Sequence, residues 1–200
     1  MAKILVLLTV LVSTQLWAKA PLGSFKTGDI LLQPLKCWSC SLIEQQEKSD
    51  YAHIGMLVKK DGQDFVLEAY MEVRLIPLAK FLEKTHPDKR VKVLRLSHST
   101  ENLTQSMLDD ANEMLGNPYD ANFLWDNFVK DKESLYCSEL LYKVLRPYIY
   151  FIDLAPKKML FDVNPKAWDR YFRGNTPRGK LGISPEDFNL SSDFQTVFWL

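Results

Sequence analysis

Short apolar or alternating runs dominate the chain between residues 30 and 96. Such runs, bounded by turn residues, predict strands rather than helices. The expected strands are Ile30–Gln33, Ala52–Lys59, Phe65–Tyr70, Val73–Ile76 and Lys89–Leu96. Asp61 and Gly62 lie between the second and third of these, and an Asp-Gly pair strongly favours a tight hairpin. We therefore expect neighbouring strands to pair in the antiparallel direction.

Helical spacing replaces this pattern after about residue 100. Apolar positions over Leu103–Leu115 fall on one side of a helix that Pro118 would end, and Cys137–Leu145 predicts a second helix before Pro147. Short helices are also expected over Ser41–Lys48 and Pro77–Glu83, a loop with a short helix over Tyr119–Val129, and short helices and loops over residues 150–200. Strands followed by helices, without βαβ alternation, indicate an α+β fold.

Composition and charge narrow the range of partners. The 200 residues are 46% hydrophobic and 25% charged, which indicates a packed globular chain of one domain. The formal net charge is zero, from 25 basic and 25 acidic residues, and no block of like charge stands out. Proteins that bind nucleic acid or anionic membrane surfaces usually carry a basic patch. The sequence therefore argues against both partners, and it carries no signal of oligomeric state.

The first 20 residues differ from the rest. Lys3 precedes the apolar run Ile4–Val12, and Ala18 and Ala20 form a small-x-small cleavage site. This order predicts a secretory signal peptide over residues 1–20, followed by a single domain over residues 21–200. An uncleaved membrane anchor is the alternative, but the run has about half of the ~20 apolar residues that a spanning helix needs. We expect an exported protein, periplasmic or secreted, without a stable membrane span.

The three cysteines divide into a close pair and a single residue. In Cys37-Trp38-Ser39-Cys40 the pair could form a local disulfide or stay as two thiols, and an oxidising compartment leaves both open. Zinc is not favoured, because a structural site needs about four ligands and no second Cys/His pair is suitably spaced. A thioredoxin-like role is not favoured, because no helix-opening context is evident. If the pair bonds, Cys137 is the odd cysteine and a candidate reactive thiol.

Three residues could act together in catalysis. Cys137 stands where the second helix is expected to begin, His53 lies in the second strand and Glu68 in the third, after the hairpin turn. They can supply a thiol nucleophile, its base and a group that orients the base. A helix N-terminus favours the thiolate, and the free N–H of Cys137 could donate to an oxyanion. Two paired strands can bring His53 and Glu68 side by side on one face.

Each of these residues also has an ordinary structural interpretation. A lone cysteine in an apolar helix is usually a small buried hydrophobic residue, a strand histidine is more often structural, and Glu68 could be a solvated strand end. Tyr51 and Tyr136, next to the candidates in sequence, could shape the site or simply fill the core. His86 and His98 are expected at the surface. The candidates gain weight because they fill three compatible roles together.

Several segments together resemble one known family. They are Gly28–Leu31, Ser49–Gly55, Val66–Ala69, Gly116–Asp120 with Phe123, Tyr136–Leu140 and Gly182–Asp187. The chain resembles the permuted papain-like amidases of the YiiX/YaeF group, within the NlpC/P60 superfamily, over about residues 26–190. In ordinary papain-like enzymes the cysteine precedes the histidine. The resemblance explains the reversed order here as a circular permutation.

The resemblance implies an α+β, circularly permuted papain-like (NlpC/P60) fold, in which a small antiparallel sheet packs against helices. It implies Cys137 as the nucleophile, His53 as the base and Glu68 as the third polar residue, without a metal or organic cofactor. Cys37 and Cys40 are not part of the family pattern, and they lie in a loop that could form the rim of the cleft.

Together, these expectations predict an exported cysteine hydrolase. It would cleave an amide of a peptide, or of a cell-envelope fragment such as a peptidoglycan stem, through a Cys-His-Glu triad and an acyl-enzyme. Related permuted folds act on acyl esters or transfer acyl groups, so a lipid or other acyl substrate is one alternative. A binding module that kept the fold without catalysis is another.

Overall fold

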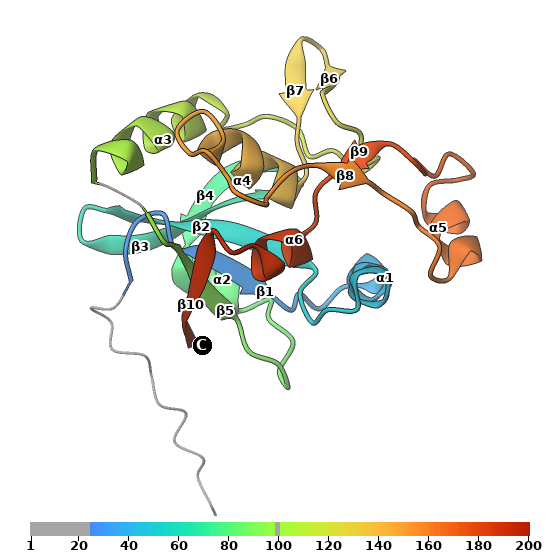
Figure 1. Cartoon of the computed structure of the whole chain (residues 1–200), viewed down its shortest axis with the longest axis horizontal. Coiled ribbons are helices and arrows are strands. Elements are labelled where there is room, and N and C mark those ends of the chain that lie inside the picture. Colours follow the sequence, from blue (N-terminus) through green and yellow to red (C-terminus); the bar gives the residue numbers. More distant parts are fainter. Residues whose placement is uncertain (1–24, 99–100) are drawn as a thin grey trace, which may run out of the picture.

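A six-stranded antiparallel sheet lies at the centre of the structure, a computed structural model that describes residues 25–98 and 101–200 (Figure 1). Its strand order is β10-β5-β1-β2-β3-β4. The strands are β1 (Ile30–Gln33), β2 (His53–Lys60), β3 (Gln63–Tyr70), β4 (Glu72–Pro77), β5 (Lys92–Leu96) and β10 (Phe194–Trp199). The five predicted strands are β1 to β5. The predicted signal peptide, residues 1–20, lies outside the described residues.

The central strands are buried on both faces, which explains their nearly continuous apolar sequences. In β2, Ile54 and Met56 join the larger core, whereas Leu57 joins a smaller core on the opposite face. Gly55 permits a close approach between β2 and its neighbours. A Cβ at this position would lie 2.4 Å from Val66 Cγ1 and 3.1 Å from the ring of Phe81.

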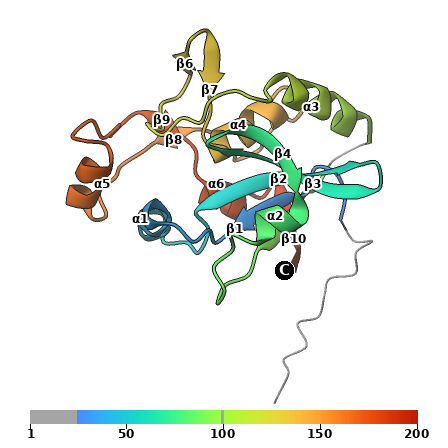
Figure 2. The same ribbon diagram turned by 180° about the vertical axis from the view of Figure 1, so that it is seen from behind.

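Helices cover both faces of the sheet. In the two opposite views, α3 (Glu101–Glu113) and α4 (Cys137–Leu145) lie over one face and α2 (Leu78–Leu82) over the other (Figure 1 and Figure 2). The bounds of α4 are those predicted from the sequence. Its buried apolar residues pack on β2 and β3, which fixes the start of the helix against the sheet. The arrangement confirms the predicted α+β class.

A second group of elements lies beside the sheet. It comprises α1 (Trp38–Glu47), α5 (Pro165–Tyr171), α6 (Pro185–Leu190) and two small hairpins, β6 (Asn127–Val129) with β7 (Lys132–Ser134) and β8 (Lys157–Lys158) with β9 (Leu181–Gly182). The rings of Trp38 in α1 and Tyr171 in α5 stack with centroids 6.1 Å apart. Ser184 and Asp187 form a capping box that starts α6. Within the described residues, no helix is long and apolar enough to cross a membrane.

Three sequence predictions are wrong in detail. Residues 119–129 contain no helix, because Asp126 takes a left-handed conformation and the chain turns into the β6–β7 hairpin. The tail was expected to contain only helices and loops, but β10 completes the sheet by pairing with β5. Helix α1 begins at Trp38 rather than Ser41, and Cys37 is its N-cap. The cysteine pair therefore does open a helix, contrary to the expectation that counted against a thioredoxin-like role.

Candidate active site

Cys137 is the first residue of α4, and its thiol is free and buried. Tyr136 before it is extended, so the Cys137 amide lies in the first turn and has no partner within the helix. This end of a helix carries partial positive charge, which favours an anionic sulfur or an oxyanion nearby. The local sequence thus places a thiol and a backbone donor at the same point.

His53 and Glu68 form a buried hydrogen-bonded pair. His53 Nε2 lies 2.7 Å from Glu68 Oε2, and both side chains are almost completely inaccessible to solvent. The imidazole also packs against Tyr70 and Phe81, with ring centroids 6.0 Å and 5.7 Å away. Cys137 lies close enough to His53 to raise the pKa of the imidazole. Because Glu68 occupies Nε2, Nδ1 is the ring nitrogen that remains for proton exchange with a thiol.

The charge balance favours a protonated imidazole. Burial acts to lower the pKa of His53, but the hydrogen bonds and charges of Cys137 and Glu68 outweigh it and raise that pKa to about 9. Burial acts to raise the pKa of Glu68, yet His53 and Arg74 together lower it. Glu68 is therefore a carboxylate, and it stabilises an imidazolium rather than a neutral ring.

Arg74 is a further member of this network that the sequence analysis did not single out. Its Nε and Nη2 donate to Glu68 Oε1 over 2.9 Å and 2.6 Å, so both oxygens of the carboxylate are engaged. Lys84 Nζ lies 3.9 Å from the same oxygen and 3.7 Å from the ring centre of Tyr70. Glu68 and Arg74 are direct partners in the β3–β4 register. A tight turn at Met71 places Glu68 opposite Arg74, so this pairing could have been predicted from the sequence.

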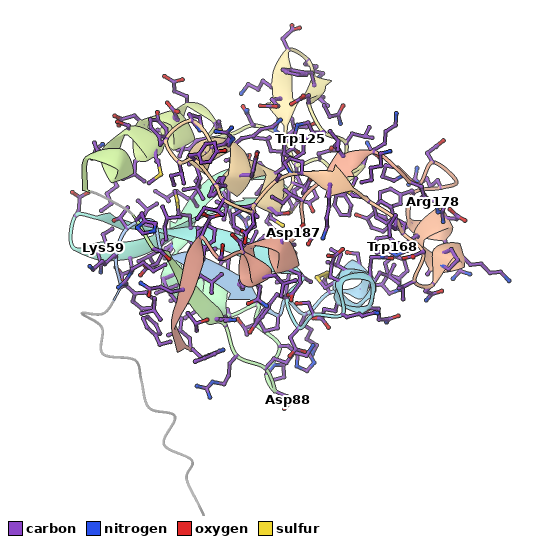
Figure 3. All side chains as sticks on the ribbon, viewed as in Figure 1. Lys59, Asp88, Trp125, Trp168, Arg178 and Asp187 are labelled. Carbon is purple, nitrogen blue, oxygen red and sulfur yellow. A yellow bond between two sulfur atoms is a disulfide. The ribbon has the colours of Figure 1, made fainter. Side chains whose placement is uncertain are left out.

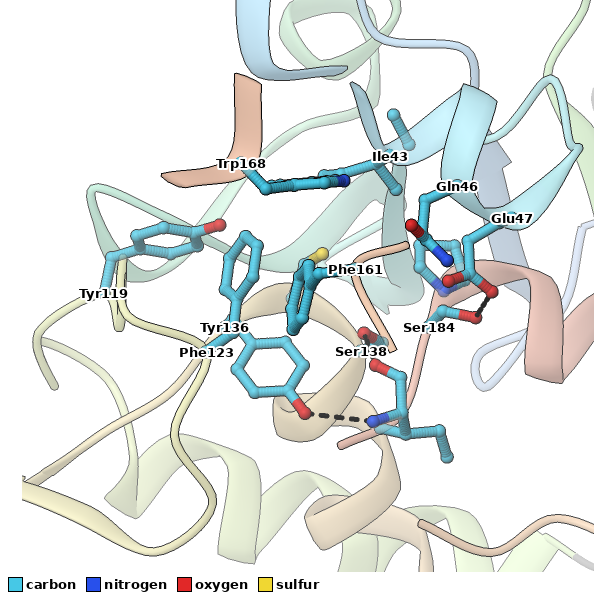
Figure 4. A pocket seen from close by; sticks show the side chains of 14 residues that line it. Ile43, Gln46, Glu47, Tyr119, Phe123, Tyr136, Ser138, Phe161, Trp168 and Ser184 are labelled. Atoms are coloured by element: carbon cyan, nitrogen blue, oxygen red, sulfur yellow. Dashed lines mark hydrogen bonds between the residues drawn. The ribbon is translucent and has the colours of Figure 1, made fainter. Parts of the chain in front are cut away.

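A narrow cavity of about 60 Å³ opens beside Cys137. Aromatic side chains surround much of it, including Tyr119, Phe123, Phe161 and Trp168 (Figure 4). The remaining lining residues are Ile43, Gln46, Glu47, Ala52, Tyr136, Ser138, Ile183, Ser184 and Pro185. The walls therefore come from α1, the loop after α3, the start of α4 and the tail.

Two hydrogen bonds hold the tail against the start of α4. Ile183 N–H donates to the Tyr136 hydroxyl over 3.0 Å, and Ser138 Oγ donates to the Ile183 carbonyl over 2.7 Å. Both residues flank Cys137, so the same helix start carries the thiol and fixes one wall of the cavity. This arrangement gives structural roles to two neighbours of the candidate nucleophile.

The two candidate tyrosines and the cysteine pair lie at different distances from the cavity. Tyr136 is buried and lines the cavity. Tyr51 does not line it; Tyr51 lies in a separate surface groove, which Trp199 also lines. Cys37 and Cys40 form a disulfide with their Cα atoms 5.1 Å apart. The disulfide lies at the start of α1, and later residues of that helix line the cavity.

Within the described residues, one acidic group has the spacing of a metal site: Asp126, Glu133 and Glu139. Lys143 Nζ lies 2.7 Å from Asp126 and 2.9 Å from Glu139, and it also contacts Glu133. A lysine ammonium therefore already supplies the positive charge that the three carboxylates require. The group lies on the β6–β7 hairpin and α4, and none of its members lines the cavity.

Comparison with known proteins agrees with the family that the sequence resembles. The chain is 30% identical over 190 residues to the uncharacterized protein YiiX of Escherichia coli (strain K12), covering 91% of this chain and 88% of YiiX. The crystal structure of "metalloprotein yiiX" from Escherichia coli O157:H7 superposes with a TM-score of 0.76 at 26% identity, covering 86% of this chain and 96% of that one. A family model described as permuted papain-like amidase, YaeF/YiiX, C92 family, matches residues 24–198. The chain thus belongs to the permuted papain-like amidases of the YaeF/YiiX family.

Proposed function

We propose that this protein is an exported cysteine hydrolase that cleaves an amide bond in a peptide or a cell-envelope fragment. Cys137 is the nucleophile, His53 moves the proton and Glu68 orients and charges the imidazole. The observation that carries the proposal is the buried group formed by the free thiol of Cys137, His53 and Glu68, in which His53 Nε2 lies 2.7 Å from Glu68 Oε2 and both neighbours raise the pKa of the imidazole. Amidase chemistry is also what the family description names.

The proposed reaction has two halves. The Cys137 thiolate attacks the amide carbonyl carbon, and the oxyanion accepts a hydrogen bond from the Cys137 amide at the start of α4. The C–N bond breaks as His53 gives its proton to the leaving nitrogen, which leaves a thioester and a free amine. Water then attacks the thioester while His53 accepts its proton. The C–S bond breaks, the carboxylic acid leaves, and the Cys137 thiolate and His53 imidazolium are restored.

A second candidate has support from the cavity. The cavity wall next to Cys137 is mostly apolar, which also suits an acyl chain. The same thiolate could therefore act on acyl esters, or pass the acyl group to an acceptor other than water. Peptide amides that release a fluorescent amine and acyl esters that release a fluorescent phenol would separate these activities. A binding module without catalysis would process neither.

A metal has no step in this mechanism. The relative solved from Escherichia coli O157:H7 is titled a metalloprotein. In this chain the acidic group Asp126, Glu133 and Glu139 already surrounds the Lys143 ammonium, so the donors present do not fit an added cation. We therefore assign all proton and acyl transfer to the protein's own side chains.

The first test is the pH dependence of iodoacetamide labelling at Cys137, in the wild type and in His53→Ala. A thiolate paired with an imidazolium should be labelled quickly even at mildly acidic pH, and His53→Ala should abolish this fast reaction. Cys137→Ala should then remove all hydrolysis while the circular dichroism spectrum stays unchanged. Slow labelling in both proteins, or hydrolysis that survives Cys137→Ala, would contradict the proposal.

Export is the remaining part of the proposal. Residues 1–20 have the order of a secretory signal peptide. N-terminal sequencing of the protein recovered from an expressing bacterium should begin at Pro21. A product that still starts at Met1 in the cytoplasmic fraction would contradict export without affecting the proposed chemistry.

A further inference from the structure

Trp168 carries an unpaired polar group in the wall of the cavity. The residue is 1% exposed and packs against Phe161 and Phe172, with ring centroids 4.9 Å and 5.9 Å away. Among the described residues, its indole Nε1 has no hydrogen-bond acceptor. Buried N–H groups are almost always paired, since leaving one unpaired is costly, so this donor needs an explanation.

The indole borders the same cavity as Cys137. Figure 3 shows Trp168 in the space between α5 and α1, and Figure 4 shows the nitrogen end of the ring turned toward Ile43 of α1. Ile43 is also a lining residue and offers only an aliphatic side chain. The donor therefore faces an aliphatic side chain of the wall, which cannot accept its proton.

Nearby polar side chains of the wall are already engaged with other partners. Gln46 donates to Asp162 over 2.9 Å and accepts from the Val163 amide over 3.1 Å. Ser184 donates to Glu47 over 2.8 Å. With these groups engaged, the Trp168 donor has no acceptor in the part of the chain that the structure describes. An occupant of the cavity is the remaining source of one.

We propose that Trp168 Nε1–H is a specificity-determining donor for the acyl part of the substrate. The acyl group that enters the cavity carries a carbonyl oxygen beyond the scissile bond, and this oxygen accepts the indole proton. A plain aliphatic chain could fill the same space but would leave the donor unpaired. The inference rests on the proposed hydrolase, and it selects acyl groups with an internal carbonyl over saturated fatty acyl groups.

The kinetic test uses p-nitrophenyl hexanoate and its 4-oxo and 5-oxo analogues, which differ from it by one carbonyl. For each ester, kcat/KM is measured in the wild type and in Trp168→Phe, so that intrinsic ester reactivity cancels in the ratio. The loss in Trp168→Phe should be about fivefold larger for one oxo ester than for hexanoate. Trp125→Phe, which alters a half-buried tryptophan outside the cavity, should show no such difference.

A direct measurement covers the case in which Trp168→Phe disturbs folding. The Cys137→Ala protein, labelled with nitrogen-15 at its indoles, is titrated with 4-oxohexanamide, 5-oxohexanamide and hexanamide. The signal that is missing from Trp168→Phe identifies the Trp168 N–H. An oxo amide should move this proton downfield, while hexanamide should leave it in place.

The outcomes distinguish a failure of the Trp168 donor assignment from a failure of the proposed hydrolase. Equal losses for all three esters, or a Trp168 signal that no oxo amide moves at any concentration, would overturn the assignment of the donor. If the signal moves as expected but the wild type hydrolyses none of the esters or the matching amides, the donor assignment stands and the proposed hydrolase fails.

Discussion

Cys137 lies between two regions built in opposite ways. On one side, His53, Glu68 and Arg74 come from adjacent strands and pair every charge with another at 2.6–2.9 Å. On the other side, aromatic rings from α5 and the loops form an apolar wall, and the Trp168 donor has no acceptor among the residues described. The charged groups of the first region are satisfied within the protein, whereas the second region leaves one hydrogen-bond donor for a ligand. Chemistry is therefore expected to depend on the polar side, and substrate choice on the aromatic side.

Among changes on either side of Cys137, the largest expected effect comes from Glu68→Gln, which keeps the shape of the polar side and removes the charge of Glu68. Without the carboxylate the pKa of His53 should fall from about 9, so the imidazolium is lost at lower pH. We expect kcat to drop about 100-fold with KM little changed, as for loss of a group that supports proton transfer. Steady-state kinetics and an NMR titration of His53 measure both effects.

Glu72→Gln is the matched control, because Glu72 is an exposed carboxylate on the neighbouring strand. It should leave kcat and the His53 titration unaltered. A Glu68→Gln enzyme that instead shows a raised KM and a normal kcat would break the proposed division between the two regions.

A smaller effect is expected from Arg74→Met. Removing the guanidinium takes a positive charge away from the Glu68–His53 pair, so the pKa of His53 should rise further above its usual 6.5. The imidazolium is present below its pKa and lost above it, so the alkaline limb of the pH–rate profile should move to higher pH. Loss of two hydrogen bonds to Glu68 should also reduce kcat by about tenfold.

Arg146→Met, which removes an exposed arginine at the end of α4, controls for the change in net charge. A profile that moves to lower pH in Arg74→Met, or an equal movement in Arg146→Met, would show that Arg74 does not act through Glu68.

The smallest effect on chemistry is expected from replacing both Cys37 and Cys40 with serine. The disulfide closes a loop with a sequence separation of 3, so its entropic contribution is about 2 kcal/mol. The free energy of unfolding in urea should fall by that amount, with kcat retained because the change lies at α1 rather than on the sheet. A large loss of kcat with unchanged stability would mean that the disulfide supports the polar side directly.

The polar side could be predicted from the sequence because regular elements determine it. The Asp61-Gly62 turn sets the pairing of β2 with β3, and the start of α4 is marked by Cys137 itself. The structure brings Cys137, His53 and Glu68 together as that pattern suggested, although their catalytic roles stay predictions. The strand pairing also contained Arg74, which a search for charged partners across the β3–β4 turn would have found.

The aromatic side could not be predicted in the same way. Trp168 and Phe161 lie in a tail of short elements whose sequence contains no long period, so nothing local indicates that they meet Cys137. The hydrogen bonds of Ile183 to Tyr136 and Ser138 place this tail, and such contacts between distant segments are not visible in one sequence. Strand β10 was missed for a related reason: its partner β5 lies about 100 residues earlier.

The disulfide at the start of α1 has a practical consequence for any assay. A cysteine hydrolase is normally handled with a reductant, because oxidation of the nucleophilic thiol inactivates it. Here the same reductant meets a second target, since Cys37 is exposed and joined to Cys40 at the head of the helix that carries Ile43 into the cavity wall. Activity plotted against reductant concentration should therefore rise as Cys137 is protected and then stay level, while the free energy of unfolding falls as the helix loses its crosslink.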